Sequence, residues 1–210
     1  MIQNPDLTFE TNLWRHYTHI AGLDEAGRGA LAGPVAVGAV ILPDAPTVLS
    51  RTLAGLRDSK QMTPLKRESV TPRIKETALA WSVGFASAEE IDAQGIVPAT
   101  RLAALRALSG LSVTPQYLLT DFRLELPELD IPQTSLVKGD VLCLSIAAAS
   151  VLAKTARDQF MCELDSCYRG YGLGKHKGYG TLSHRSAMKR LGISAIHRRS
   201  FQVKGTQVDK

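Results

Sequence analysis

Four carboxylates stand where apolar segments begin or end, a position that suits a metal-dependent enzyme. Asp24 and Glu25 follow one short apolar run, Asp121 follows another, and Asp140 precedes a long stretch of small and apolar residues. The ends of neighbouring strands converge in an open sheet, and ligands collect there. Carboxylates are costly to bury beside apolar strands, and a divalent cation with oxygen ligands offsets that cost. Four of them could hold two Mg²⁺ or Mn²⁺ ions about 4 Å apart, as in enzymes that hydrolyse phosphodiesters.

Taken alone, the Asp24–Glu25 pair favours a solvated acidic turn at a strand end. The glycines Gly22, Gly27 and Gly29 on both sides favour a ligand site, because glycine lets backbone amides approach a bound group closely. The pair is therefore interpreted together with the other acids rather than by itself.

Two further polar groups lie near apolar segments. Asp58, Ser59 and Lys60 form a triplet that fits a loop contacting phosphate or an ordinary turn, and both interpretations stay open. Asp158 follows Asp140 by five full helical turns, which separates them by about 27 Å along one helix. We therefore expect Asp158 to have a structural role outside any metal site.

The charge of the chain is divided unevenly along its length. The 210 residues carry a formal net charge of +5. Ten lysines and arginines follow Tyr168 against one acid, Asp209, so the chain is about −4 before Tyr168 and +9 beyond it. An acidic site beside a basic surface is typical of a metal-dependent enzyme acting on nucleic acid. A basic tail without any partner is the alternative.

The three cysteines and the N-terminal residues bear on location. Three cysteines without a CxxC pair indicate a reducing compartment and argue against a disulfide framework or a structural zinc. Residues 1–19 lack a basic start followed by an apolar core, and the apolar run 30–42 is too short to span a bilayer. We expect a soluble, cytoplasmic monomer with no membrane partner.

The apolar pattern predicts an α/β fold in three parts. These are a loosely held N-terminal leader at 1–18, a catalytic core at 19–168 and a basic C-terminal helical region at 169–210 whose last residues are loosely ordered. Strands are predicted at 20–23 and 35–42, paired as a hairpin, and at 80–86, 117–120 and 135–137. Helices are predicted at 64–77, kinked or divided at Pro72, and at 88–92, 97–111, 141–168 and 183–191, with Ser183 as the last one's N-cap. The segment 43–55 is expected to be a loop.

Assembled in order, these residues resemble the bacterial type 2 ribonucleases H, the ribonuclease HII family. The matching stretches cover about Ile20 to Phe201. They are AGLDEAGRG at 21–29, DSK at 58–60, KGD at 138–140, SIAAASVLAK at 145–154 with RD at 157–158, HKGY at 176–179 with Thr181, and HRRSF at 197–201. Each is weak alone, and together they are highly specific.

The resemblance implies a ribonuclease H-like fold, with a central mixed β-sheet flanked by helices and a small C-terminal helical part. It implies metal-dependent cleavage, with Mn²⁺ or Mg²⁺, of RNA in RNA–DNA hybrids and of ribonucleotides embedded in duplex DNA. The family's metal-binding acids fall on Asp24, Glu25, Asp121 and Asp140. Its element that reads the 2′-hydroxyl falls on Gly27, Arg28 and Gly29, and its substrate-sensing tyrosine on Tyr179. Further substrate contacts are expected from Asp58, Ser59, Lys60, Lys154, Lys177, Arg198 and Arg199.

The sequence departs from the family's pattern at three positions. Phe122 follows the third acid where glycine is common, Gln61 follows Asp58-Ser59-Lys60 where lysine is usual, and Gly180 replaces a common proline. The first bears on the geometry at Asp121, and the others on a phosphate contact and a loop. None of the three removes a catalytic group.

Two other groups of residues have competing interpretations. Tyr179 is expected to pack on the sugar beside the 2′-hydroxyl, which alone distinguishes RNA from DNA at one nucleotide; the alternative is a loop anchor. His176, His184 and His197 lack the carboxylate companions of a metal site and are expected to contact phosphate or solvent. The rival functions are another metal-dependent nuclease or strand transferase of similar fold, and a hybrid-binding module without catalysis.

Overall fold

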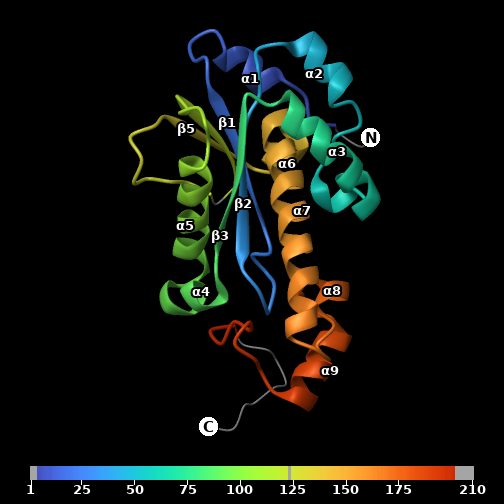
Figure 1. The fold of residues 1–210 in the computed structure, drawn as a ribbon. Coiled ribbons are helices and arrows are strands. Elements are labelled where there is room, and N and C mark those ends of the chain that lie inside the picture. Colours follow the sequence, from blue (N-terminus) through green and yellow to red (C-terminus); the bar gives the residue numbers. More distant parts are fainter. Residues whose placement is uncertain (1–3, 123, 202–210) are drawn as a thin grey trace.

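A five-stranded mixed sheet forms the centre of the chain in this computed structural model, which describes residues 4–122 and 124–201. The strands lie in the order β3-β2-β1-β4-β5 (Figure 1). Their bounds are β1 Ile20–Ala26, β2 Val35–Ile41, β3 Ala80–Ala86, β4 Tyr117–Asp121 and β5 Gln133–Leu136. All seven residues of β2 are buried, as expected for an apolar strand inside a sheet covered on both faces.

The pairing of β1 with both neighbours confirms the predicted hairpin and brings the acidic segments together. β1 pairs antiparallel with β2, with Asp24 opposite Gly38, and parallel with β4, with Leu23 opposite Thr120. The sequence predicted that the strand ends at Leu23, but β1 continues to Ala26 and includes both acids. Because successive residues of a strand point to opposite faces, this places the acidic side chains on different sides of β1.

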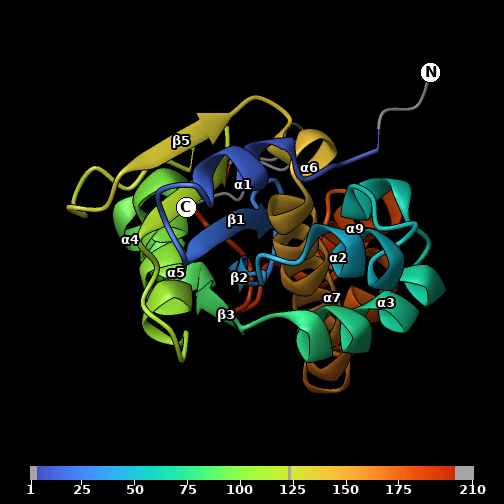
Figure 2. The ribbon, with the colours of Figure 1, turned by 90° about the horizontal axis from the view of Figure 1, so that it is seen from above.

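Helices cover both faces of the sheet. The long helix α7 (Leu144–Cys167) lies on one face against β1 and β2, with α2 (Pro46–Thr52) and α3 (Pro64–Thr77) outside it (Figure 2). The helices α4 (Ala88–Gln94) and α5 (Ile96–Ser109) cover the other face, where α5 contacts β2 and β3. An added Cβ at Gly22 or Gly38 would overlap the α7 backbone at Ser145 or Ala149, so α7 rests directly on the sheet.

Several element boundaries differ from the sequence prediction. The predicted helix 141–168 is two helices, α6 (Gly139–Leu142) and α7, separated by the extended backbone of Cys143. The segment expected to be a loop contains α2, and Pro72 lies inside α3 without dividing it. The last helix, α9 (Leu182–Leu191), takes Thr181 as its N-cap in place of the expected Ser183.

The N-terminal residues pack against the rest of the chain, in contrast to the predicted loose leader. The short helix α1 (Thr8–Leu13) carries Glu10, which is 1% exposed. One carboxylate oxygen of Glu10 accepts a 2.8 Å hydrogen bond from the amide of Ser145 and a 3.0 Å bond from the thiol of Cys143. Glu10 therefore joins α1 to the break between α6 and α7.

The C-terminal part is helical, with α8 (Leu173–His176) and α9 below the sheet in Figure 1. It meets the loop between β1 and β2, where the amide of Leu31 donates to the carbonyl of Gly178 at 2.8 Å and the amide of Arg198 donates to the carbonyl of Leu31 at 2.9 Å. The residues predicted to be loosely ordered at 202–210 lie outside the described residues. None of the helices in the described part of the chain has the length and apolar character to cross a membrane.

Candidate metal and nucleic-acid site

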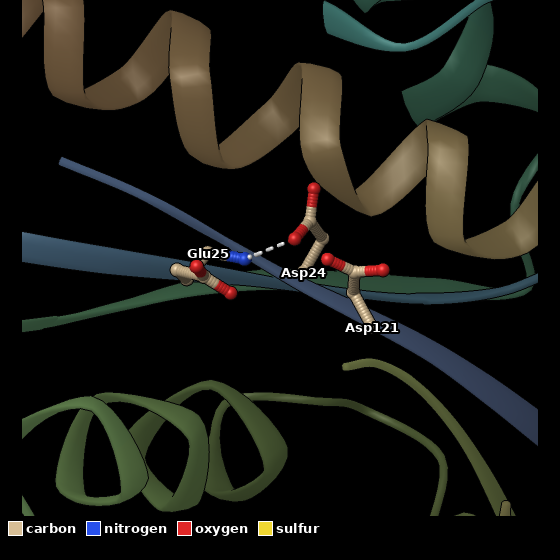
Figure 3. A group of neighbouring side chains, drawn as sticks. All are labelled: Asp24, Glu25 and Asp121. Atoms are coloured by element: carbon tan, nitrogen blue, oxygen red, sulfur yellow. Dashed lines mark hydrogen bonds between the residues drawn. The ribbon is translucent and has the colours of Figure 1, made fainter. Parts of the chain in front are cut away.

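Three carboxylates from β1 and the end of β4 converge beside α7. Asp24, Glu25 and Asp121 each offer a carboxylate oxygen that lies within 4.8 Å of the others. Figure 3 shows the side chain of Asp24 directed toward α7, with the carboxylate of Asp121 beside it. The parallel pairing of β1 and β4 brings these acids together although almost a hundred residues separate them in the sequence.

The electrostatics of this group fit a bound cation. Asp24 is 1% exposed, and its Oδ2 has no hydrogen-bond partner among the described residues, nor has Oε2 of Glu25. Burial, followed by the charge of Glu25, raises the pKa of Asp24 well above its usual range. Burial raises the pKa of Glu25 as well, and Asp121 adds to that effect. Buried, mutually repelling oxygens without donors are ligands suited to a hard divalent cation.

Asp140 lies next to this group, although it is not among the three mutually close oxygens. The amide of Gly139, the preceding residue, donates a 2.7 Å hydrogen bond to Oδ1 of Asp121. Asp140 is buried, and its Oδ2 lies 3.8 Å from Nζ of Lys60. Burial, with the nearby charges of Asp58 and Asp121, raises the pKa of Asp140 to about 6.

A cleft of about 680 Å³ opens over these acids. Cationic and apolar side chains line the cleft together with the carboxylates, so a negatively charged polymer with aromatic bases could lie in it. Phe122 and Val137 are 48% and 62% exposed there. The lining residues are Glu25, Arg28, Asp58, Lys60, Gln61, Asp121, Phe122, Val137, Lys138, Asp140 and Val141.

Asp58, Ser59 and Lys60 form a turn, one of the two interpretations left open by the sequence, while contact with phosphate stays a prediction. The turn is of the 3₁₀ type, and in it Oδ1 of Asp58 accepts a 2.8 Å bond from the amide of Lys60. Ser59 is buried and its hydroxyl accepts a 2.8 Å bond from Ser150 of α7. The side chain of Lys60 is 70% exposed and lines the cleft, which leaves its ammonium group accessible to a ligand.

Arg198 forms hydrogen bonds to the backbone of the loop at Gly27, Arg28 and Gly29. Gly27 has φ +85°, a left-handed conformation that suits glycine. The guanidinium of Arg198 donates to the carbonyls of Gly27 at 2.7 Å, Arg28 at 2.9 Å and Gly33 at 2.9 Å. Arg198 is 3% exposed, and its donors already bond to backbone oxygens. This arrangement differs from the phosphate contact that was expected of Arg198.

Arg199, the next residue, lies at the surface in contrast to Arg198. Its side chain is exposed, while its backbone amide donates a 2.9 Å bond to Asp92 at the end of α4. Ser200 donates to the same carboxylate from its amide and its hydroxyl. Asp92 therefore anchors the C-terminal segment through three hydrogen bonds.

Tyr179 lies close to two cations of α7. Its ring centroid is 5.1 Å from Nζ of Lys154 and 5.4 Å from Cζ of Arg157. Nζ of Lys154 also forms a 2.7 Å ion pair with Asp158, which pairs in addition with Arg67 at 3.2 Å. Asp158 is thus structural, as its spacing from Asp140 predicted.

Lys177, also expected to contact substrate, makes contacts within the protein. Its ammonium group donates to the carbonyl of Gly174 and, at 3.0 Å, to the thiol of Cys162. Its backbone adopts a left-handed conformation with φ +54°, unusual for a residue other than glycine. Substrate contact by Lys154 or Lys177 would therefore compete with bonds that each already makes.

The expectation that three histidines contact phosphate or solvent is wrong. His176, His184 and His197 are 8%, 0% and 2% exposed. The rings of His176 and His184 stack at 4.2 Å, and Nε2 of His184 lies 3.2 Å from Nε2 of His197. Nδ1 of His184 is 3.0 Å from the carbonyl of Tyr179, so this cluster supports the tyrosine's backbone. Burial, with the charges of the neighbouring histidines, lowers the pKa of His184 to about 4.

Arg157, for which the sequence predicted no role of its own, is fully buried. It donates to the carbonyls of Pro34 at 2.7 Å, Lys177 at 3.0 Å and Ala32 at 3.1 Å. A charged residue on a helix is expected on the solvent side, so no local signal in the sequence indicated the burial of Arg157. Its partners lie far away in the sequence, so no local pattern could identify them.

Comparison with known proteins gives a consistent match. Residues 21–204 match the family described as Ribonuclease HII. The chain is 50% identical over 198 residues to the Ribonuclease HII of Dehalococcoides mccartyi, and the match covers 94% of this chain and 92% of the relative.

Solved structures with the same fold include the ribonuclease H2 of Pyrococcus horikoshii OT3. It matches with a TM-score of 0.71 and 24% identity over 88% of this chain and 94% of that one. The complex of Bst-RNase HIII with Mn²⁺ matches with a TM-score of 0.60 and 17% identity over 83% and 70% of the two chains. These likenesses confirm the predicted ribonuclease H-like arrangement of a mixed sheet flanked by helices.

Proposed function

The chain belongs to the ribonuclease HII family, and from that premise we propose that it cuts the 5′ side of single ribonucleotides embedded in duplex DNA. Membership makes it a metal-dependent endoribonuclease of the ribonuclease H type that acts on RNA–DNA hybrids. The finer proposal includes the products, a 3′-hydroxyl and a 5′-phosphate, and the use of two divalent cations. We propose Mg²⁺ or Mn²⁺ for both positions and a monomer as the active unit.

One observation carries this proposal: a group of acids borders the same cleft as Arg28, and the amides of Arg28 and Gly29 have no protein acceptor among the described residues. Asp24, Glu25 and Asp121 offer oxygens within 4.8 Å of one another, and Oδ2 of Asp24 and Oε2 of Glu25 lack hydrogen-bond partners in the described residues. The cleft beside them is lined by Arg28 and Asp140. Hydrolysis at one sugar requires both a catalytic centre and a group that recognises that sugar, and the proposal assigns these roles to the acids and to the loop at 27–29.

The four acids Asp24, Glu25, Asp121 and Asp140 would hold the cations. When bound, divalent cations supply charge stabilisation at the phosphodiester and lower the pKa of water. The oxygens of Asp24 and Glu25 that lack donors fit this role, because a buried carboxylate oxygen needs a cation or a donor. Asp140 is proposed as a ligand on the side of the cleft that faces Lys60.

The protein's own groups would bind and orient the substrate. Lys60 extends into the cleft with its ammonium group accessible, which suits a phosphate beside the cut. Arg28 lines the same cleft, and its guanidinium lies 3.9 Å from Glu25. Exposed Arg199 is proposed to contact the duplex backbone at longer range.

Recognition of ribose is proposed to involve the loop from Gly27 to Gly29 and Tyr179. Within residues 4–122 and 124–201, the amides of Arg28 and Gly29 donate to no protein acceptor. An amide without a protein partner can donate to a 2′-hydroxyl, which DNA lacks. The ring of Tyr179 is half-buried and would pack on the adjacent sugar.

The test uses a labelled duplex with one ribonucleotide, beside matched duplexes carrying 2′-deoxy or 2′-O-methyl sugar at that position. We expect one cut on the 5′ side of the ribonucleotide in Mn²⁺ or Mg²⁺ and none in the two control duplexes. Equal cutting of the all-deoxy duplex would favour a general nuclease. Binding of the hybrid without any cutting would favour a module that only binds.

A further inference from the structure

Two buried arginines hold the loop between β1 and β2 from the inside. Arg157 of α7 and Arg198 near the C-terminus together donate to six backbone carbonyls. Five of these belong to the loop residues Gly27, Arg28, Ala32, Gly33 and Pro34, and the sixth belongs to Lys177. A single guanidinium can reach three oxygens because its donors form a rigid planar fork.

The arginines have no acidic partner in this arrangement. Among the described residues, neither Arg157 nor Arg198 forms an ion pair, and both are less than 4% exposed. Burial and the charge of Arg157 lower the pKa of Arg198 to about 9, which still leaves it charged at neutral pH. Within residues 4–122 and 124–201, backbone carbonyls therefore accept all the hydrogen bonds of these two buried charges, and losing them would be costly. Such a site fixes the positions of those carbonyls strongly.

The orientation of the carbonyls determines the orientation of the amides. Peptide groups are planar, so a carbonyl directed inward directs the amide of the same peptide group outward. Arg198 holds the carbonyls of Gly27 and Arg28, and the amides of those two peptide groups belong to Arg28 and Gly29. Among the described residues, neither of these two amides donates to a protein acceptor.

Arg157 connects the same loop to Tyr179. Its guanidinium bonds to Ala32 and Pro34 on one side and to the carbonyl of Lys177, two residues before Tyr179, on the other. Its Cζ also lies 5.4 Å from the centroid of the Tyr179 ring. A Cβ added at Gly27 would overlap the Arg157 side chain, so the loop and the arginine are packed closely.

We propose that Arg157 and Arg198 are positioning residues for ribonucleotide recognition, which set the place of the Arg28 and Gly29 amides relative to the Tyr179 ring. This rests on the function proposed above. Neither arginine touches the substrate. Each acts through the backbone that it holds, and together they make one recognition surface from the loop between β1 and β2 and from the segment before α9.

The proposal predicts different losses on two substrates. A lone ribonucleotide offers one 2′-hydroxyl, so the amides and the ring must meet it in a single register. A continuous hybrid offers a 2′-hydroxyl at every sugar of its RNA strand, so a displaced loop still finds partners. A displacement of about 1 Å can cost on the order of a hundredfold in rate where one geometry is required.

The experiment compares wild type, Arg198→Lys, Arg157→Lys and the control Arg106→Lys in the full chain. Lysine keeps the charge but cannot bond three carbonyls in a plane. Arg106 lies on α5, where it pairs with Glu90 at 2.7 Å and donates to the carbonyl of Phe85, and among the described residues it forms no hydrogen bond or ion pair with residues 27–34. Values of kcat/KM are measured on a duplex with one ribonucleotide and on a continuous RNA–DNA hybrid, with thermal unfolding and hydrogen exchange of residues 27–34.

We expect each loop variant to lower the ratio of single-ribonucleotide to hybrid cleavage by at least about tenfold and to speed exchange of 27–34. Arg106→Lys should leave the ratio unchanged. Equal losses on both substrates, an unchanged ratio, or variants that fail to fold would overturn the proposal and leave a structural role only. A wild type that cuts hybrid but no single ribonucleotide would instead overturn the proposed function, and this inference with it.

Discussion

The amide of Gly139 donates a 2.7 Å hydrogen bond to Oδ1 of Asp121, which joins the end of β4 to the start of α6. The bond turns one acid toward the chain segment that carries the next one, Asp140. It also occupies one oxygen of Asp121 with a neutral donor, so only part of that carboxylate is available to a cation.

Asp121→Asn should therefore keep the fold and lose activity. The amide oxygen of asparagine can still accept from Gly139, so unfolding temperature should change by little. Cleavage should fall by more than the roughly 10–100-fold that loss of an outer partner of a metal site costs. Thermal unfolding and hybrid cleavage measure the two effects. Near-wild-type cleavage would remove Asp121 from the metal site.

Asp24→Asn should abolish turnover and yet stabilise the protein without metal. Burial and the charge of Glu25 raise the pKa of Asp24 well above its usual range. The protonated carboxyl group therefore stabilises the fold below about pH 3.9, and this contribution to stability is lost as the pH rises. At pH 7.5 the charged form is destabilising, and a neutral isostere removes that cost. Thermal unfolding in chelator should show a higher midpoint for the variant, and Mn²⁺ should stabilise wild type only.

Exposed Glu128 supplies the matched control for that experiment. Glu128→Gln removes one negative charge from a surface loop and should change neither the midpoint in chelator nor turnover. A midpoint for Asp24→Asn that lies below that of wild type in chelator would contradict the electrostatic account of the site.

Tyr179→Ala should damage cutting at a lone ribonucleotide more than cutting of a continuous hybrid. The ring lies near Lys154 and Arg157, so its position is supported independently of its hydroxyl. Tyr179→Phe should accordingly be milder, within about tenfold of wild type if packing carries the effect. Steady-state cleavage of both substrates measures this. Equal losses from the two substitutions would assign the role to the hydroxyl.

Arg199→Ala should reduce the salt dependence of duplex binding, because its side chain is exposed and contacts with phosphate release counterions. The log–log slope should flatten by about 0.9 for one lost contact with B-DNA. Anisotropy titrations between low and moderate salt, with Ca²⁺ replacing the catalytic cation, measure it. An unchanged slope would place Arg199 away from the duplex.

His184→Gln should lower stability at neutral pH, with a gap to wild type that narrows in acid. The pKa of His184 is lowered to about 4, so the neutral ring stabilises the fold fully above about pH 6.5 and loses that contribution as pH falls toward 4. Loss of its buried bonds should cost roughly 1–3 kcal/mol at pH 7.5. Unfolding midpoints across pH 4–8 measure the gap, with exposed His16→Gln as control. A gap independent of pH would mean that His184 does not titrate as stated.

The acids were predictable because their signal is local. Asp24, Glu25 and Asp121 each interrupt an apolar run, and strand order then brings them together. The buried roles of Arg157 and Arg198 were not predictable, because their partners are backbone carbonyls far away in the sequence. Glu10 illustrates the same limit: an acid in a polar N-terminal segment is expected at the surface, and its bond to Ser145 spans 135 residues.

The glycines Gly22 and Gly38 give the two faces of the sheet different tolerance to redesign. On the side of α7 the spacing between helix and sheet is set by backbone meeting backbone, so no choice of side chain could adjust it without moving Asp24. The face under α5 makes the same close approach at Gly84, where an added Cβ would overlap the backbone of Ala103 and Ala107, but the apolar side chains elsewhere on that face could be replaced by other apolar residues. A programme to raise the working temperature of this enzyme should therefore vary those side chains of the α5 face, keep Gly84, and leave the α7 face untouched.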